Sequence, residues 1–217
     1  MINLNFNQTE ESELKILCLG AHCDDIEIGC GGTILKLIQE YSNITVYWVV
    51  FSSSEQTAQE AAVSSNTFLK EVSNKKVIIK NLEGGLLYFQ GKELHECFEE
   101  LKQEFSPDVI FTHHRQDKHQ DHRLISDYTW NTYRNHLILE YEIPKYDGDL
   151  GFPNLFVHLD EAVCRRKIKY VMDAFYTQNN KQWFTEENFR SILKIRGMES
   201  SSPSQYSEAF HSRKIVF

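Results

Sequence analysis

The stretch LKILCLGAHCDDIEIGCGG, residues 14–32, decides the fold and raises the question of function. Its first seven residues form a short apolar run, which is the pattern of a β-strand buried on both faces. His22 and the adjacent carboxylates Asp24 and Asp25 follow this run directly, and three glycines lie within residues 29–32. We expect these glycines to let the backbone turn sharply and to let a ligand approach it closely.

The segments that follow alternate between strand and helix patterns. The predicted strands are short and apolar, and the predicted helices repeat their apolar residues at helical spacing. This alternation predicts an α/β fold, with a Rossmann-like, mostly parallel sheet, helices on both faces and a single domain over residues 1–217. The predicted strands are 14–20, 43–53, 75–82 and 108–113, and the predicted helices are 31–41, 55–72, 91–105 and 122–135.

The C-terminal third has a less regular pattern. Residues 145–154 are rich in turn residues and predict a surface loop, and the polar stretch 199–207 predicts a flexible segment. At the other end of the chain, residues 1–13 are expected to form a flexible N-terminal segment. The remaining predicted elements are strands at 136–144 and 154–159, a helix at 160–178 opened by Asp160, and a helix at 185–197 opened by Thr185 with Asn188 in third place.

The composition excludes several classes of protein. Hydrophobic residues make up 41% and charged residues 25%, as in an ordinary globular protein, and no apolar run reaches the roughly 18 residues of a membrane span. The formal net charge of −8 disfavours a nucleic-acid partner. The N-terminus lacks a secretion signal, and the five cysteines are irregularly spaced, so we expect a cytoplasmic protein with reduced thiols.

A second polar stretch, THHRQDKHQDHR at residues 112–123, follows the fourth predicted strand and holds four of the nine histidines. Taken alone, such a stretch is more simply a solvated surface loop. Ligands of open α/β sheets bind outside the carboxyl ends of the strands, so we expect this stretch to face the same rim as residues 22–25.

The two stretches together predict a metal site. His22 and Asp25 supply one imidazole and one carboxylate, and His122 or His119 supplies a second imidazole. Two histidines and one carboxylate are a usual ligand set of catalytic zinc (Zn2+), with one position left for water. The same set suits Fe2+ or another divalent metal.

Three other functions agree less well with these residues. A dinucleotide site would need glycine where His22 stands, and would not place two carboxylates beside a pyrophosphate. A metal-dependent phosphoesterase usually holds two metals and more carboxylates than this rim offers. A metal-free partner protein would not need a complete set of ligands.

The pair formed by AHCDDIEIGCGGT, residues 21–33, and THHRQDKHQDHR closely resembles the motifs of the LmbE-like, or PIG-L, family of metal-dependent N-acetylglucosamine deacetylases. The resemblance extends through PNLFVHLDE, residues 153–161, and RG…YSEAF, residues 196–210, so it covers nearly the whole chain. It implies a zinc-dependent hydrolase that removes the N-acetyl group from an amino sugar or from its nucleotide, lipid or glycoside conjugate. The alternatives are a deacetylase of an N-acetylglucosaminyl thiol conjugate and a phosphoesterase.

The resemblance also implies roles for individual residues. It makes His22, Asp25 and His122 the metal ligands and Asp24 the general base. It makes His119, in its protonated form, the group that stabilises the oxyanion.

Further residues have weaker assignments. Asp121 is expected to assist catalysis by orienting an imidazole, and Asp117 is a rival for that role. Arg115, Glu83 and Glu208 are candidate substrate contacts, and Arg115 has the alternative of simply pairing with Asp117. The expected partner is a small amino-sugar substrate, and a homo-oligomer is possible.

Two features depart from the family pattern. Cys23 replaces the family's proline, which leaves the loop freer and places a soft metal ligand beside the site, although we expect its side chain to point away. The substrate-binding arginine of some sugar-specific members is missing from SSEQTAQEAA, residues 53–62. The second departure leaves the identity of the sugar open.

Overall fold

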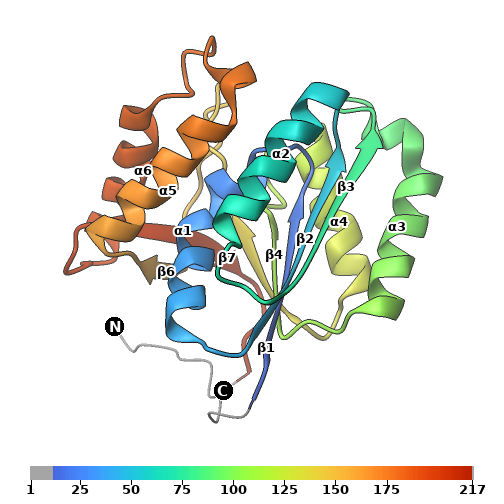
Figure 1. The fold of residues 1–217 in the computed structure, drawn as a ribbon, viewed down its shortest axis with the longest axis horizontal. Helices are drawn as coiled ribbons and strands as arrows, with labels where there is room; N and C mark the ends of the chain where they lie inside the picture. The colour runs from blue at the N-terminus through green and yellow to red at the C-terminus, as the bar shows by residue number, and fades with distance from the viewer. Residues whose placement is uncertain (1–11, 217) are drawn as a thin grey trace.

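The computed structural model describes residues 12–216, so the expected flexible segment 1–13 lies outside the described residues apart from its last two. Within this range, seven strands form one sheet in the order β3-β2-β1-β4-β5-β7-β6 (Figure 1). The strands are β1 (Leu14–Gly20), β2 (Ile44–Ser52), β3 (Asn74–Leu82), β4 (Val109–His113), β5 (Leu137–Tyr141), β6 (Leu155–His158) and β7 (Ser207–Ser212).

The direction of the strands places the edge at which a ligand binds. Strands β1 to β5 are parallel, as predicted, whereas β7 lies antiparallel between β5 and β6. The chain runs from β1 outward to β3 and then returns to β4 on the other side of β1. The carboxyl ends of β1 and β4 therefore form the topological switch point where such sheets bind their ligands.

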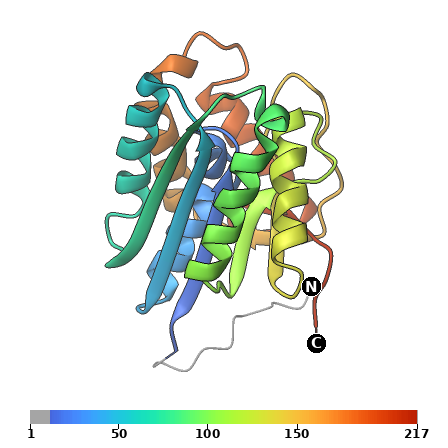
Figure 2. The same cartoon turned by 90° about the vertical axis from the view of Figure 1, so that its right-hand side faces the viewer.

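Helices cover both faces of the sheet, which confirms the predicted fold class (Figure 2). Their bounds are α1 (Asp25–Glu40), α2 (Glu55–Phe68), α3 (Gly91–Glu104), α4 (Gln120–Thr132), α5 (Glu161–Ala174) and α6 (Glu186–Glu199), with short 3-10 helices η1 (Leu87–Gln90) and η2 (Tyr176–Gln178). Helices α1, α2, α5 and α6 pack on one face, and α3 and α4 pack on the other. The side chains of β1 alternate between the two cores, since Ile16 joins the first core and Leu17 joins the second.

Helix α1 differs from the prediction. It begins at Asp25 rather than at residue 31, so the glycines of the opening stretch lie inside the helix and the expected sharp turn is wrong. Their missing side chains admit neighbouring rings instead. A Cβ atom at Gly29 would lie 2.2 Å from the ring of Tyr141, and one at Gly31 would lie 2.7 Å from the ring of Phe68.

Replacing Gly29 with alanine should therefore destabilise the protein. The new methyl group would overlap Tyr141, which is fully buried and whose hydroxyl donates a hydrogen bond to the carbonyl of Leu19. Overpacking a core costs about 1–3 kcal/mol, and we expect a loss of that size in the free energy of unfolding measured with urea. Gly91→Ala is the matched control, because a Cβ there meets the Tyr128 hydroxyl at an ordinary 3.5 Å. Equal losses in the two variants would contradict the packing argument.

The C-terminal segment is more regular than predicted. The expected flexible stretch 199–207 is a tight turn that leads into β7, a strand that the pattern does not predict. The predicted start of α6 is confirmed, because the side chain of Thr185 accepts a hydrogen bond from the Asn188 N–H. Asp160 stands at the expected N-cap of α5, although its side chain receives no capping hydrogen bond from the described residues.

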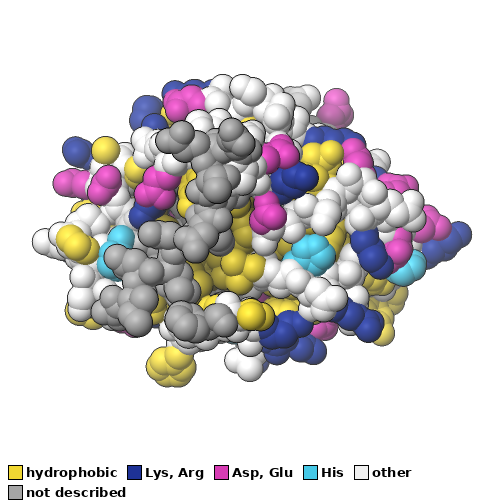
Figure 3. Space-filling view, turned by 90° about the horizontal axis from the view of Figure 1, so that it is seen from below, with side chains coloured by type: hydrophobic (Ala, Val, Ile, Leu, Met, Phe, Trp, Pro, Cys, Tyr) yellow, Lys and Arg dark blue, Asp and Glu magenta, His cyan; other side chains and the backbone are white. Residues whose placement is uncertain are grey.

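The amino ends of the parallel strands lie at the face opposite the switch point. The described part of this face carries acidic and basic side chains interspersed with apolar ones, rather than a continuous basic surface (Figure 3). Among residues 12–216, no helix combines the length and the apolar character needed to cross a bilayer.

Candidate active site

The two polar stretches meet at the carboxyl ends of β1 and β4, which are neighbours in the sheet. His22 lies in the turn after β1, and Asp24 and Asp25 are the N-cap and the first residue of α1. His119 is the N-cap of α4, and His122 lies in the first turn of that helix. The fold therefore brings together the residues that the sequence singles out.

Two imidazole nitrogens and the carboxylate of Asp25 converge at this point. Nδ1 of His22 lies 3.1 Å from Nε2 of His122 and 3.3 Å from one carboxylate oxygen of Asp25. The same Nε2 of His122 lies 3.4 Å from the other oxygen of Asp25. Ligands about 2.0–2.1 Å from a tetrahedral zinc ion are separated from one another by about 3.3–3.4 Å. The spacing thus fits a metal ion held by these three residues.

A competing set replaces His22 with His113, the last residue of β4, beside Asp25 and His122. Nε2 of His113 lies 3.2 Å from Asp25, but it also accepts a hydrogen bond of 2.9 Å from the N–H of Ala21. That bond occupies the lone pair that a metal would need, and the His113 ring is fully buried. The side chain of His22 is 27% exposed, so the set with His22 leaves a position open to water and substrate.

Two further carboxylates hold the imidazole rings in place. Asp117 accepts a hydrogen bond from Nδ1 of His122 at 2.9 Å, and Asp121 accepts one from Nε2 of His22 at 3.1 Å. Asp121 also accepts a hydrogen bond of 2.5 Å from the backbone N–H of Gly85. Such outer carboxylates fix the ring orientation and make a metal-binding imidazole more basic. Asp117 therefore orients the ring of His122, and Asp121 orients the ring of His22.

The carboxylates make this point favourable for positive charge. Burial by itself would lower the pKa of His22, but the charge of Asp25 and the hydrogen bond to Asp121 outweigh it and raise that pKa to about 10. Burial opposes protonation of His122 as well, but Asp25 and Asp117 raise its pKa to about 9. Carboxylates that hold protons on two imidazoles in this way also favour a bound metal cation.

In the Asp117→Ala protein we expect the affinity for zinc to fall by about 10–100-fold, because the His122 ring loses the partner that orients it. Competition for Zn2+ with a chromophoric chelator measures this affinity. Asp127→Ala is the matched control, since that carboxylate lies on α4, is half exposed and pairs with Arg115. Unchanged affinity in Asp117→Ala would argue against His122 as a ligand.

Asp24 provides a carboxylate beside the three converging ligands. It is 8% exposed and stands at the N-cap of α1, where none of the described residues donates a capping hydrogen bond to its side chain. Burial, followed by the charge of Asp25, raises the pKa of Asp24 to about 6. A carboxyl group with a pKa in this range is suited to take up a proton and to return it.

His119 lies next to both histidine ligands, with its ring centroid 4.7 Å from that of His22 and 4.6 Å from that of His122. Its Nδ1 accepts a hydrogen bond from the backbone N–H of Asp121, so the proton of the neutral ring is on Nε2. Burial, followed by the charges of His122 and His22, lowers the pKa of His119 to about 4. Nε2 of His119 is therefore the nitrogen available to donate a hydrogen bond, and the protonated form stays a prediction.

Two of the weaker candidates lie exposed near the rim. Glu83 is in the loop after β3, the same loop whose Gly85 binds Asp121. Arg115 is exposed and pairs with Asp127 at 3.1 Å. Neither is held by a contact with the three converging ligands.

Two other candidates are turned toward the core. The carboxylate of Glu208 is occupied by Lys167 and by backbone N–H groups of α1, so we do not propose it as a substrate contact. The thiol of Cys23 donates to the carbonyl of Ser52, and burial raises its pKa to about 12. Cys23 is thus a neutral thiol packed in the core, and its side chain points away from the ligands.

Two residues of the site are not among those predicted. His113 accepts a hydrogen bond from the Ala21 N–H and so holds the turn before His22; its only signal in the sequence is that a histidine ends an apolar strand. The ammonium group of Lys145 lies 3.0 Å from the carboxylate of Asp117 and donates a hydrogen bond to it. Lys145 belongs to the turn-rich loop, where a lysine is an ordinary surface residue and gives no signal.

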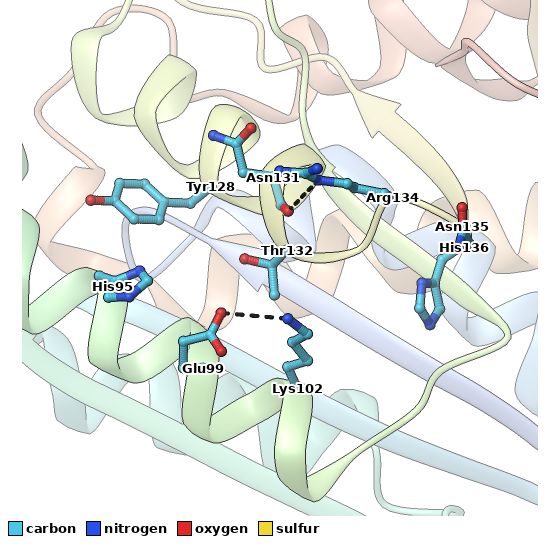
Figure 4. Close-up of a pocket in the computed structure, with 9 residues that line it drawn as sticks. All are labelled: His95, Glu99, Lys102, Tyr128, Asn131, Thr132, Arg134, Asn135 and His136. Atoms are coloured by element: carbon cyan, nitrogen blue, oxygen red, sulfur yellow. Dashed lines mark hydrogen bonds and ion pairs between the residues drawn. The ribbon is translucent and has the colours of Figure 1, made fainter.

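A separate cavity of about 770 Å³ lies between α3 and the C-terminal half of α4 (Figure 4). It is lined by polar residues, some of them acidic and some basic, for example Glu99, Lys102 and Arg134. It lies at the opposite end of α4 from His122 and includes none of the ligand residues. The chemistry of the converging histidines and carboxylates is therefore not part of this cavity.

Comparison with known proteins points to the same part of the chain. Residues 17–133 match the model of a family described as PIG-L: GlcNAc-PI de-N-acetylase. This range runs from β1 to the end of α4 and contains all three converging ligands. A curated relative, the "uncharacterized deacetylase YaiS" of Escherichia coli (strain K12), is 29% identical over 116 residues, which span 51% of this chain and 63% of the relative.

Solved structures extend the likeness to the whole fold. The conserved protein TT1542 from Thermus thermophilus superimposes with a TM-score of 0.74 at 18% identity, over 94% of this chain and 96% of that one. The N,N'-diacetylchitobiose deacetylase from Pyrococcus horikoshii does so with a TM-score of 0.64 at 20% identity, over 92% of this chain and 83% of that one. At these identities the likeness shows a shared fold.

Proposed function

This chain belongs to the PIG-L (GlcNAc-PI de-N-acetylase) family, and from that premise we propose that it is a metal-dependent N-deacetylase. The reaction would hydrolyse the amide of an N-acetylated amino sugar, or of a conjugate of one, to acetate and a free amine. The observation that carries the proposal is the convergence of His22, Asp25 and His122 beside Asp24, a carboxylate left over for acid–base chemistry.

Amide hydrolysis needs an activated water, a stabilised oxyanion and an acid for the departing nitrogen. A divalent metal held by His22, Asp25 and His122 would polarise the acetyl carbonyl and lower the pKa of a water molecule toward 7. Asp24 takes the proton of the attacking water and later gives it to the amine. The Nε2–H of neutral His119 donates a hydrogen bond to the oxygen on which negative charge develops, a contribution of about 3 kcal/mol for one donor.

The proposed metal is zinc. Two imidazoles and one carboxylate are a usual set for zinc in hydrolases, and the distances between the two imidazole nitrogens and the Asp25 carboxylate are close to those of tetrahedral ligands. The same set also suits Fe2+, so the metal assay should include both ions.

The amino-sugar part of the proposal is supported by the family description and by the name of the Pyrococcus deacetylase. A local feature agrees with it. The loop that binds Asp121 through Gly85 continues into Tyr88 and Phe89, whose side chains are 74% and 81% exposed. Exposed aromatic faces beside a site offer a surface for the apolar C–H face of a sugar ring.

Removing these rings in a Tyr88→Ala/Phe89→Ala protein should raise KM by about 2- to 10-fold and leave kcat close to the wild-type value. The size corresponds to about 0.5–1.5 kcal/mol, the usual worth of an aromatic contact, and uniform binding affects KM alone. Steady-state kinetics on the N-acetylated substrate gives both constants. Met198→Ala, which alters a similarly exposed side chain on α6, should change neither. An unchanged KM in the double variant would exclude these rings from substrate binding.

A panel of N-acetylated monosaccharides, sugar nucleotides and N-acetylglucosaminyl thiol conjugates tests the proposed function. Acetate release and labelling of the new amine should both depend on zinc and should stop when a chelator is added. A signal on the thiol conjugates alone would favour that alternative substrate class. No release from any member, together with metal-dependent cleavage of a phosphodiester, would make the protein a phosphoesterase.

A further inference from the structure

A buried ion pair contacts the helix that carries the site. Lys167 of α5 and Glu208 of β7 are each 3% exposed, and the Lys167 ammonium nitrogen lies 2.5 Å from the Glu208 carboxylate. Neither residue touches the three converging ligands. Both contact the backbone of α1, whose N-terminal turn carries Asp24 and Asp25.

The contacts are made to backbone groups that a helix normally uses for itself. Lys167 donates a hydrogen bond of 2.6 Å to the carbonyl of Ile28. Glu208 accepts hydrogen bonds from the N–H groups of Gly32 and Thr33, at 2.8 and 2.6 Å. The Ile28 carbonyl and the Gly32 N–H are four residues apart and would pair with each other in a regular α-helix. The ion pair therefore holds α1 by its backbone, and not only by side-chain packing.

Gly32 makes this approach possible. A Cβ atom at this position would lie 2.9 Å from the carboxylate of Glu208 and 2.5 Å from the side chain of Leu159. The third glycine of the opening stretch is thus explained by a charged partner that arrives from the far end of the chain.

The held segment connects directly to the site. The N–H of Ile28 donates to the carbonyl of Asp24 at 3.1 Å, so Ile28 belongs to the same helical turn as Asp24 and Asp25. A shift of Ile28 along the helix axis would move both carboxylates. The distances of Asp25 to His22 and His122, at 3.3 and 3.4 Å, leave little room for such a shift.

We infer that Lys167 and Glu208 are positioning residues, which fix the first turn of α1 so that Asp25 meets the two histidines at metal-binding distance. The inference rests on the proposed function in taking Asp25 as a metal ligand. It gives the C-terminal half of the chain, outside the range that matches the family model, a defined part in the site.

Three variants separate positioning from stability: Lys167→Met, Glu208→Gln and the double variant. Each single variant leaves a buried charge or a buried hydrogen-bonding group without its partner, so the urea midpoint of the metal-free protein should fall. The double variant removes both charges and should regain most of that midpoint. Its affinity for Zn2+ should nevertheless stay about 10-fold below the wild-type value, because the Ile28 carbonyl has lost Lys167 and a neutral amide with a single acceptor oxygen replaces the Glu208 carboxylate.

Competition with a chromophoric chelator measures the affinity, and the absorption spectrum of the Co2+-substituted protein reports the geometry of the ligands. The matched control is Arg196→Met/Glu142→Gln, which removes a buried pair of similar exposure that joins α6 to the segment after β5. It should lower the midpoint and leave zinc affinity unchanged. Recovery of zinc affinity together with the midpoint in the Lys167/Glu208 double variant would overturn the inference, as would wild-type affinity in both single variants.

Two additions keep the test decisive. If Lys167→Met does not fold, Gly32→Ala supplies a second measurement of zinc affinity, because its methyl group would overlap the Glu208 carboxylate as well as the Leu159 side chain. Wild-type zinc binding and amine release test the proposed function separately. If both hold while the variants keep full zinc affinity, only the positioning role is lost; if the wild type binds no zinc, the proposed function fails first.

Discussion

In the Asp24→Asn protein we expect kcat to fall by about 10²–10⁴-fold while the zinc content stays at the wild-type level. Asparagine preserves the size of the side chain but cannot accept the proton of the attacking water. The substitution also removes no capping hydrogen bond of α1, because the Asp24 side chain receives none from the described residues. Steady-state kinetics and elemental analysis of the same preparation measure the two quantities.

The matched control is Asp160→Asn, since Asp160 is also an N-cap residue whose side chain receives no capping hydrogen bond from the described part of the chain. This variant should keep both its turnover and its metal. Wild-type turnover in Asp24→Asn would remove the general base from the mechanism. Loss of zinc from Asp24→Asn would instead place Asp24 among the ligands.

The His122→Ala protein should lose its metal, and all measurable turnover with it. His122 supplies Nε2 to the converging set, and its own position is held by Asp117. The loss of a metal ligand should lower the affinity for zinc by more than the about 10–100-fold that follows the loss of a residue orienting a ligand. His22→Ala should behave in the same way, and elemental analysis after dialysis against a weak chelator is the measurement.

His136→Ala is the control for these two proteins, because His136 lies in the turn between α4 and β5, beyond the opposite end of α4 from the ligands. Full zinc occupancy in both ligand variants would show that the ligand assignment is wrong. Full occupancy in His22→Ala alone would favour the competing set with His113.

The parallel part of the sheet could be predicted because each strand is an apolar run between clear turn signals. The start of α1 could not be predicted, because glycine disfavours a helix when only the neighbouring residues in the sequence are considered. The compensating contact at Gly29 comes from the ring of Tyr141, far along the chain. Strand β7 could not be predicted for a similar reason, since its sequence SEAFHS acquires its strand structure from pairing with β5 and β6.

The convergence of the candidate ligands could be predicted because two polar stretches each follow a strand, and parallel strands end at one edge. The residues that surround the candidate ligands were harder to predict from the sequence. In the sequence His113 is simply the last residue of an apolar strand. Nothing in the loop around Lys145 marks that lysine as a partner of Asp117. The sequence suggests a substrate contact for Glu208 because a carboxylate in a motif suggests binding, whereas its partner Lys167 lies on a different element and is found only by folding.

Strand β3 ends the sheet, and among the described residues it pairs with β2 alone. An edge strand presents unpaired backbone groups to which a strand of another molecule can add, which is a route to aggregation. The sequence of β3, NKKVIIKNL, places Lys75, Lys76 and Lys80 around its apolar centre. Lys76 and Lys80 also form ion pairs with Glu104 and Glu100 of α3. An incoming strand would have to desolvate these charges, so the lysines of β3 disfavour strand addition at this edge.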